Sequence, residues 1–299
     1  MDHKDFTSSL PQAEMVRLTT RSDRLGLRHL AGHLGLILLG GIWIASGWPL
    51  WQAVLPLHGV VLVFLFTLEH EATHKTPFAS VRLNEWAGRL TGLMILLPFE
   101  WFRYFHLAHH RHTNIPGNDP ELAAGAHPET WREYLLYASG LRYWRDALRQ
   151  VLVNAVGGDP GEFVPPRAQP RVTVEARWML AAYALAGTSL LFSPLLLWIW
   201  VLPMLLGQPV LRLYLLAEHG RCAFVANMFE NTRTTLTNRA VRFLAWNMPY
   251  HVEHHTLPLV PFHRLPELHA KMRGHLEVTA PSYRAFTLDY AAGLSRSTD

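Results

Sequence analysis

Long apolar stretches alternate with polar, charged stretches along the chain. Apolar runs of about 17–25 residues are long enough to cross a lipid bilayer as a helix. Pro203, Gly207 and Pro209 should kink the last of these stretches. The pattern predicts an all-α integral membrane protein with four transmembrane helices, over about residues 30–48, 52–68, 178–192 and 195–217.

The residues between the second and third apolar stretches are mixed. Residues 90–99 are apolar but too few to cross the bilayer, so we expect a re-entrant or interfacial segment. Residues 131–156 interleave Trp, Tyr and Arg with Leu at helical spacing, which is typical of a helix lying among lipid headgroups. A plain amphipathic core helix is an equally good interpretation of this spacing. Residues 157–170 are rich in Pro and Gly and predict a loop.

Basic residues lie on one side of the predicted membrane helices. The two turns expected near Pro49 and Pro194 contain no Lys or Arg. The positive-inside rule therefore places both termini and every histidine cluster in the cytosol. The first 28 residues are polar and basic without an apolar core, so we expect no cleavable signal peptide.

The composition fits a membrane protein with substantial cytosolic mass. Hydrophobic residues make up 49% of the chain and charged residues 17%. The net charge is +4, but the Arg residues form no basic run, which favours a membrane surface as partner and not nucleic acid. Cys222 is the single cysteine, which excludes an intramolecular disulfide and a cysteine-based metal site, and is compatible with the reducing cytosol.

Eight of the 18 histidines gather in three short clusters. Histidines at positions i, i+3 and i+4 share one side of a helix, so each cluster can direct its imidazoles at one region. Imidazole is the commonest protein metal ligand, and eight are twice what one tetrahedral zinc ion uses. The excess predicts a two-metal site formed by His70 and His74, by His106, His109 and His110, and by His251, His254 and His255.

Two other classes of function compete with a two-metal enzyme. Residues 70–74 read H-E-x-x-H, the zinc protease signature in which Glu71 would be the general base. That interpretation needs one zinc ion and one further ligand, so it leaves the other clusters without a role. A protein that stores or transports metal is the third interpretation.

The three clusters and their neighbours resemble the three histidine boxes of membrane fatty acid desaturases and hydroxylases. The resemblance covers roughly residues 50–275, and within the superfamily it is nearest to the bacterial rhizopine-oxygenase-like branch. It extends to Trp101, Phe102 and Arg103, to Thr113, Asn114, Asp119 and Pro120, and to residues 247–250, 253, 258–261 and 265–266.

The resemblance implies four membrane helices with a cytosolic helical cap, in which histidines hold two iron ions that activate dioxygen. It adds His219, which directly follows the last apolar stretch, to the metal ligands. His112 does not correspond to any metal ligand of the family. We expect His58, within the second apolar stretch, to be a buried, hydrogen-bonded residue. The implied ligands are His70, His74, His106, His109, His110, His219, His251, His254 and His255.

Acidic and amide side chains should surround these ligands. Nine neutral imidazoles leave a metal pair strongly cationic, so neighbouring polar groups are needed to orient the rings and to moderate the charge. The candidates are Glu71, Glu218, Asn247, Glu253 and Asp119.

The electrons for dioxygen activation should come from another protein. The sequence contains no haem-attachment motif, no dinucleotide-binding motif and no cysteines for an iron–sulfur cluster. We expect an electron donor of the ferredoxin, rubredoxin or cytochrome b5 type. Its docking site, or a site for lipid headgroups, would use Arg103, Arg111, Arg233, Arg239 and Arg242.

The expected function is oxygen-dependent desaturation or hydroxylation of an unactivated C–H bond in a fatty acyl or lipid substrate. The alternative is hydroxylation or oxidative demethylation of a small molecule, and histidine spacing does not separate the two. We expect a single domain over residues 1–299 in a bacterial inner membrane. It would comprise an N-terminal segment (1–28), membrane helices with part of the cap (about 30–217), and the remaining cap and tail (218–299).

Overall fold

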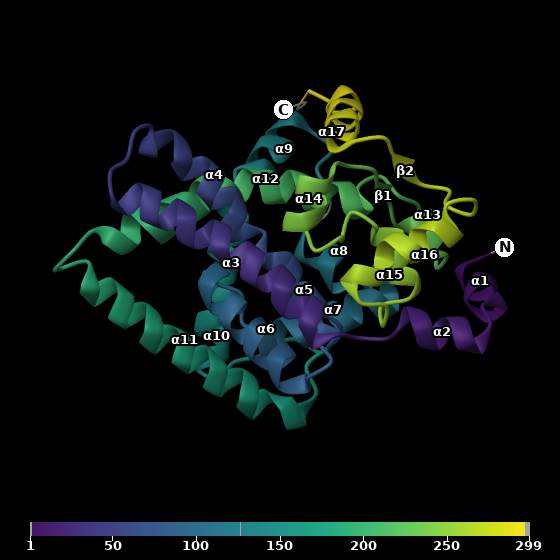
Figure 1. Ribbon diagram of the computed structural model, residues 1–299, viewed down its shortest axis with the longest axis horizontal. Helices are drawn as coiled ribbons and strands as arrows, with labels where there is room; N and C mark the ends of the chain where they lie inside the picture. Colours follow the sequence, from purple (N-terminus) through teal and green to yellow (C-terminus); the bar gives the residue numbers. More distant parts are fainter. Residues whose placement is uncertain (1, 126, 297–299) are drawn as a thin grey trace.

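The computed structural model describes residues 2–125 and 127–296 and is mainly helical (Figure 1). The predicted helical fold is therefore confirmed. A short parallel pair of strands, β1 (Thr234–Thr235) and β2 (Thr279–Ala280), departs from the all-α pattern. These strands lie among the short helices that follow α12 (Leu202–His219), and β1 contacts that helix.

Three helical segments among the described residues are long and apolar enough to cross a membrane. They are Gln12–Ala45, which contains α3 (Asp23–Ala45), Trp51–Thr73, which contains α4 (Trp51–Val63) and α5 (Leu65–Thr73), and Leu197–His219, which contains the π-helical η2 (Leu197–Val201) and α12 (Leu202–His219). The third predicted span corresponds to α11 (Gln169–Ser189). Its first half carries Arg171, Glu175 and Arg177, so it is less apolar than the other three.

Helices α4 and α12 touch through their backbones. A Cβ atom added to Gly59 would lie 1.9 Å from the carbonyl oxygen of Pro203, and one added to Gly207 would lie 2.2 Å from the carbonyl carbon of Gly59. Small residues allow helices in membranes to approach this closely. Gly207, which the sequence suggested as a point of bending, is therefore also the contact that brings α12 against α4.

Gly207→Ala should destabilise the fold by about 1–3 kcal/mol, because the added methyl group must push two helix backbones apart. The measurement is thermal unfolding of the detergent-solubilised protein. Gly41→Ala on α3 is the matched control, since nothing lies within 4 Å of a Cβ atom there. Equal melting temperatures for the two variants would contradict the backbone contact.

The segment between α5 and α11 differs from the sequence prediction in two places. Residues 90–95 end the helix α6 (Val81–Ile95), and a turn at Leu96 leads into α7 (Phe99–His112), so no re-entrant segment forms. The expected single helix over residues 131–156 is two helices, α9 (Trp131–Ala138) and α10 (Leu141–Ala155). They separate at Gly140, whose φ of +72° a helix does not accommodate.

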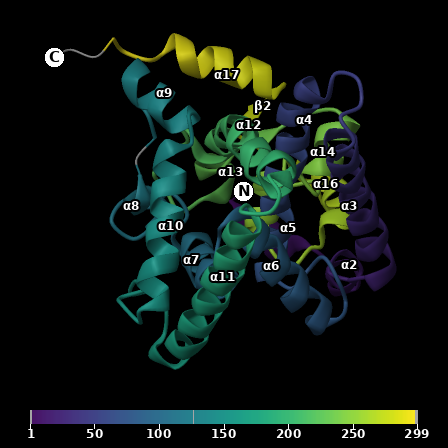
Figure 2. The same cartoon turned by 90° about the vertical axis from the view of Figure 1, so that its left-hand side faces the viewer.

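The predicted loop after α10 is confirmed up to Pro165, where the 3-10 turn η1 (Pro166–Ala168) leads into α11. Helices α10 and α11 then lie side by side (Figure 2). The amphipathic α10 thus packs against the helix that follows it.

Short helices form the rest of the structure and enclose the third histidine cluster. Phe6 and Leu18 from the N-terminal helices share one apolar core with Phe229, Val252 and Leu265. The N-terminal segment therefore packs against α15 and α16, as Figure 1 also shows. The remaining elements are α1 (His3–Ser9), α2 (Gln12–Leu18), α8 (Pro120–Ala124), α13 (Met228–Asn231), α14 (Arg239–Leu244), α15 (His251–Thr256), η3 (Phe262–Arg264), α16 (Leu265–Met272) and α17 (Tyr283–Ala292).

Candidate metal centre

Four helices bring the nine candidate histidines together. Helix α5 carries His70 and is followed directly by His74, and α12 ends at His219. Helix α7 carries the second cluster, and α15 carries the third. The side chains are buried, except that His110 is half-buried. Segments up to 185 positions apart in the chain therefore meet at one place.

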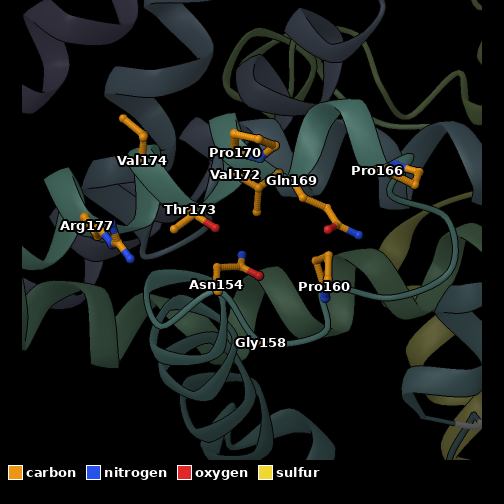
Figure 3. A pocket seen from close by; sticks show the side chains of 11 residues that line it. Asn154, Gly158, Pro160, Pro166, Gln169, Pro170, Val172, Thr173, Val174 and Arg177 are labelled. Carbon is orange, nitrogen blue, oxygen red and sulfur yellow. The ribbon is translucent and has the colours of Figure 1, made fainter.

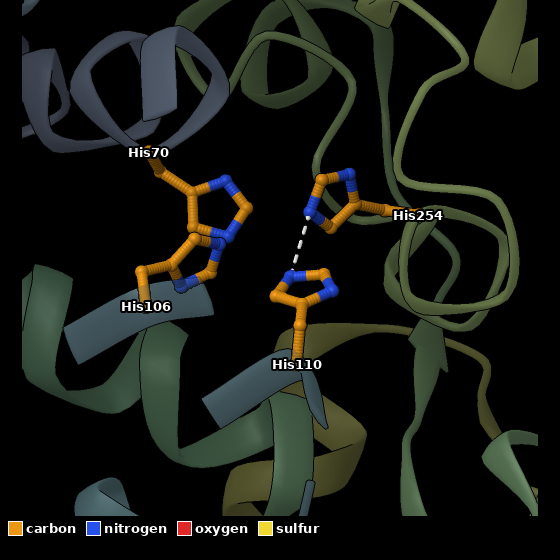
Figure 4. Close-up of side chains that lie close together, drawn as sticks. All are labelled: His70, His106, His110 and His254. Carbon is orange, nitrogen blue, oxygen red and sulfur yellow. Dashed lines mark hydrogen bonds between the residues drawn. The ribbon is translucent and has the colours of Figure 1, made fainter. Parts of the chain in front are cut away.

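The histidines form two adjacent groups. In the first, one ring nitrogen from each of His70, His106, His110 and His254 lies within 4.8 Å of the others (Figure 4). His74 joins this group because its Nε2 lies 2.9 Å from Nε2 of His106.

The second group contains His109, His219 and His255, and one ring nitrogen from each lies within 4.8 Å of the others. His251 joins it, with Nε2 at 3.2 Å from Nε2 of His219 and 3.1 Å from Nε2 of His255. The rings of His110 and His255 stack with centroids 4.0 Å apart, so the two groups are neighbours.

Helical geometry explains how one cluster serves two groups. Successive helical residues are rotated by about 100°, so residues i and i+4 point nearly the same way, while residue i+3 points to the side. On α7, His106 and His110 enter the first group and His109 enters the second. Helix α15 makes the opposite division, since His254 enters the first group while His251 and His255 enter the second.

The donor set fits metal ions. Close contacts between ring nitrogens place lone pairs toward one another, and neither ring nitrogen of His70 has a hydrogen-bond partner in the described structure. Burial, reinforced by the neighbouring imidazoles, holds the pKa values of His106, His110, His254 and His255 well below the usual range. Neutral imidazoles are the form that binds zinc, copper, iron or nickel.

Asp119 orients one imidazole of the second group. Both of its carboxylate oxygens lie 3.0 Å from Nδ1 of His109. The carboxylate also accepts hydrogen bonds from the backbone N–H groups of Asn114 (2.7 Å) and Glu121 (2.9 Å). Burial opposes ionisation of Asp119, but the bond to His109 and these backbone donors keep its pKa below the usual range. A fixed carboxylate on Nδ1 leaves Nε2 of His109 free for a metal.

Two more of the expected acids approach the histidines. Oε1 of Glu71 lies 3.6 Å from Nδ1 of His254, and Oε1 of Glu218 lies 3.5 Å from Nδ1 of His251. The other oxygen of Glu71 accepts hydrogen bonds from the Phe262 N–H (3.1 Å) and the Thr76 hydroxyl (3.0 Å). Glu71 is thus held in place beside the first group.

The other two expected neighbours have different partners. Glu253 pairs with the Thr234 hydroxyl and with Nδ1 of His269, because it points away from the side of α15 that carries the candidate ligands. The Asn247 amide donates to the carbonyl of Phe262 at 2.9 Å. Both residues connect the segments around α15, and neither makes a hydrogen bond to one of the nine histidines in the part of the chain described.

A family model for fatty acid desaturases matches residues 21–287 of the chain. The chain belongs to the fatty acid desaturase family. Its long apolar helices agree with the membrane character of this family.

Curated relatives of this desaturase-family protein act on lipids according to their names. A chloroplastic omega-3 fatty acid desaturase of Brassica napus is 24% identical over 215 residues, covering 67% of this chain and 52% of the relative. A sphingolipid delta(4)-desaturase/C4-monooxygenase of Mus musculus is 27% identical over 207 residues, covering 66% and 58%. The chain thus spans about half the length of the curated relatives it matches.

The name of a third relative contains the word ferredoxin. This relative is the chloroplastic temperature-sensitive sn-2 acyl-lipid omega-3 desaturase (ferredoxin) of Arabidopsis thaliana, 28% identical over 115 residues, which cover 38% of this chain and 26% of the relative. The matches give no support to the zinc protease or metal-transport interpretations.

Two polar contacts at the desaturase-family site were missed by reasoning from the sequence. The Thr113 hydroxyl lies 3.1 Å from Nδ1 of His255, and the carbonyl of Asn231 lies 3.2 Å from Nδ1 of His219. Thr113 stands in the stretch after the second box, where its position could have suggested this role. Asn231 has no sequence signal, because only the turn after α12 brings its backbone to the site.

The two histidines left out of the ligand set lie outside both groups. His58 is 3% exposed and its Nε2 lies 2.8 Å from the carbonyl oxygen of Ile199, which confirms the prediction of a buried, hydrogen-bonded residue. His112 is half-buried at the end of α7.

Two of the five arginines proposed for docking are engaged inside the protein. The Arg103 side chain is 11% exposed and pairs with Glu85 at 2.6 Å. Buried Arg233 donates to the carbonyl of Ala217 at 2.9 Å. Their inclusion in the docking site was wrong, because charge in the sequence does not reveal internal pairing. Arg111 and Arg239 are exposed, and Arg242 is half-buried.

Proposed function

We propose that the two histidine groups hold two iron ions, with dioxygen as co-substrate, and that the protein desaturates or hydroxylates an unactivated C–H bond of a fatty acyl or lipid substrate. The observation that carries this proposal is the division of nine imidazoles into two adjacent groups. Five would hold one iron and four the other. Bound iron would supply the oxygen chemistry, which no side chain can perform.

The protein's own residues would keep this site neutral, oriented and dry. Burial excludes water and favours the unprotonated form of imidazoles such as His106, His110, His254 and His255. Asp119, Glu71 and Glu218 would fix ring orientation and offset the charge of the metals. Phe66 and Phe102 flank the first group, with centroids 6.1 Å from the ring of His70 and 5.5 Å from that of His106. These apolar rings suit an aliphatic substrate chain.

The proposal includes both desaturation and hydroxylation. The two reactions begin with removal of the same kind of hydrogen atom, and the mouse relative's name contains both activities. Hydroxylation or oxidative demethylation of a small molecule, as the likeness to the rhizopine-oxygenase-like branch implies, is the alternative substrate class.

Metal content and metabolite analysis test the function together. We expect two iron ions per chain in the purified protein, and a new unsaturated or hydroxylated lipid in cells that express it. Cells expressing His70→Ala are the control for the lipid analysis. One zinc ion per chain with peptidase activity would support a protease, and variable metal content would support storage or transport. A change confined to polar metabolites would support the small-molecule alternative.

The proposed topology has four membrane helices, with α11 as the third, and a cytosolic cap that contains the site. The basic residues near the helix ends support this orientation in a bacterial inner membrane. Single-domain organisation over residues 1–299 is part of the same proposal. The packing of the N-terminal helices against α15 and α16 supports it.

A reporter fused to either terminus should indicate the cytosol, because the outer turns lack Lys and Arg. Paired alkaline phosphatase and green fluorescent protein fusions measure this, with fusions in the turn after Ser46 as the periplasmic control. A periplasmic signal from one terminus only would show an odd number of spans and contradict the topology.

An external protein of the ferredoxin, rubredoxin or cytochrome b5 type would supply electrons. The name of the Arabidopsis relative supports a ferredoxin. Exposed Arg111 and Arg239, together with Arg242, offer positive charge for an acidic donor.

A further inference from the structure

A cleft of about 380 Å³ opens between the end of α10 and the beginning of α11 (Figure 3). None of the nine histidines lines it. Four polar side chains, from Asn154, Gln169, Thr173 and Arg177, face one another among Gly, Pro and Val residues. The lining contains no carboxylate, so its only formal charge is the positive charge of Arg177.

Asn154 presents a hydrogen-bond donor without a protein acceptor. Its side chain is 1% exposed, and its Oδ1 accepts a hydrogen bond from the Gln150 amide at 2.8 Å. Its Nδ2 has no partner among the described residues. In Figure 3 this nitrogen points into the cleft, toward the side that carries Thr173. A buried amide N–H left without an acceptor is costly, so its orientation favours an acceptor in the cleft.

The backbone carbonyls at the end of α10 do not supply that acceptor, because each of the last four already has a partner. Three are paired with backbone N–H groups, and the fourth, that of Ala155, accepts a hydrogen bond from Nε of Arg177 at 2.8 Å. The paired groups are Leu152 with Val156, Val153 with Gly158, Asn154 with Gly157, and Ala155 with Arg177. The cleft therefore offers mainly donors.

We propose that this cleft binds a phosphate group. A phosphate has several acceptor oxygens and a negative charge, which match the Asn154 amide, the Thr173 hydroxyl and the guanidinium of Arg177. The positive end of the α11 dipole also favours an anion here.

A phospholipid headgroup and free phosphate share this chemistry. Beyond the cleft, α11 continues with exposed apolar side chains, including Trp178 and Leu185, each 73% exposed. A lipid with its phosphate in the cleft could lay its acyl chains along this side of the helix. The proposed site is separate from the metal centre, so it does not depend on the proposed oxidation.

Binding of short-chain lipids to the purified, full-length protein tests the site. Calorimetric titrations in a non-ionic detergent would compare dihexanoyl phosphatidic acid, dihexanoylglycerol and inorganic phosphate. Thr173→Val removes one donor at nearly constant volume, and Asn154→Asp replaces a donor with an acceptor. The matched controls are Thr188→Val, exposed on the same helix, and Arg149→Gln, exposed on α10.

We expect phosphatidic acid to bind and dihexanoylglycerol not to bind. Each cleft variant should weaken the affinity about tenfold or more, since a hydrogen bond to a charged group is lost, while the controls bind as the wild type does. If inorganic phosphate binds with the same affinity as phosphatidic acid, and the variants weaken both to the same extent, the site would be assigned to free phosphate. The proposal would be overturned if neither phosphate compound binds. It would also be overturned if Thr173→Val has a wild-type melting temperature and leaves the binding unchanged.

Discussion

His219→Ala should abolish oxidation and lower iron content from two ions per chain toward one. His219 lies in the second group, with Nε2 3.2 Å from that of His251, and its Nδ1 is occupied by the carbonyl of Asn231. The second iron would therefore lose one of four imidazoles, and both irons are needed for the proposed reaction. Iron analysis by mass spectrometry and product analysis on the same preparation measure the two effects.

His112→Ala is the matched control for this experiment. His112 is also a histidine, and it ends α7, the helix that carries the second cluster, but it is outside both groups. Its loss should leave iron content and turnover close to those of the wild type. Two irons and full activity in His219→Ala would show that His219 is not a ligand, and the second group would then need another one.

Asp119→Ala should reduce iron retention or turnover about 10- to 100-fold while the protein still folds, which is the usual effect of removing a carboxylate that orients a metal-binding histidine. The variant frees Nδ1 of His109 and removes the acceptor for the backbone N–H groups of Asn114 and Glu121. Iron loss during dialysis against a chelator is the measurement.

Asp146→Ala provides the comparison, because Asp146 is exposed and pairs only with its neighbour Arg145 among the described residues. Its iron should dissociate at the wild-type rate. If Asp119→Ala and Asp146→Ala lose iron at identical rates, Asp119 does not support the metal centre.

The histidine spacing predicted that a metal site exists, but not how the ligands are shared. From the sequence, His106, His109 and His110 form one cluster directed at one region. In the structure His109 belongs to the second group and the other two to the first. The rotation of about 100° between neighbouring residues is a local property. Which group each side of α7 meets depends on α5, α12 and α15, which pack around it.

The same distinction holds for helices and charges. Apolar stretches predicted the long helices, because hydrophobic length is a property of a continuous segment. The break at Gly140 was missed, since glycine is also tolerated inside helices and its φ of +72° is set by the packing of α9 and α10. The charge of Arg103 was evident in the sequence, but its pairing with Glu85 requires α6 and α7 to be neighbours.

The sequence by itself determined the helical pattern, the type of ligand and the family, because these depend on residue identity and on spacing within short segments. Only the tertiary structure decided the division into two groups, the contact of Asp119 with His109, and the role of the Asn231 carbonyl. These are contacts between side chains and backbone on separate elements. Their distances are fixed by how the helices pack, through contacts such as that of Gly59 with Gly207, and no local pattern encodes them.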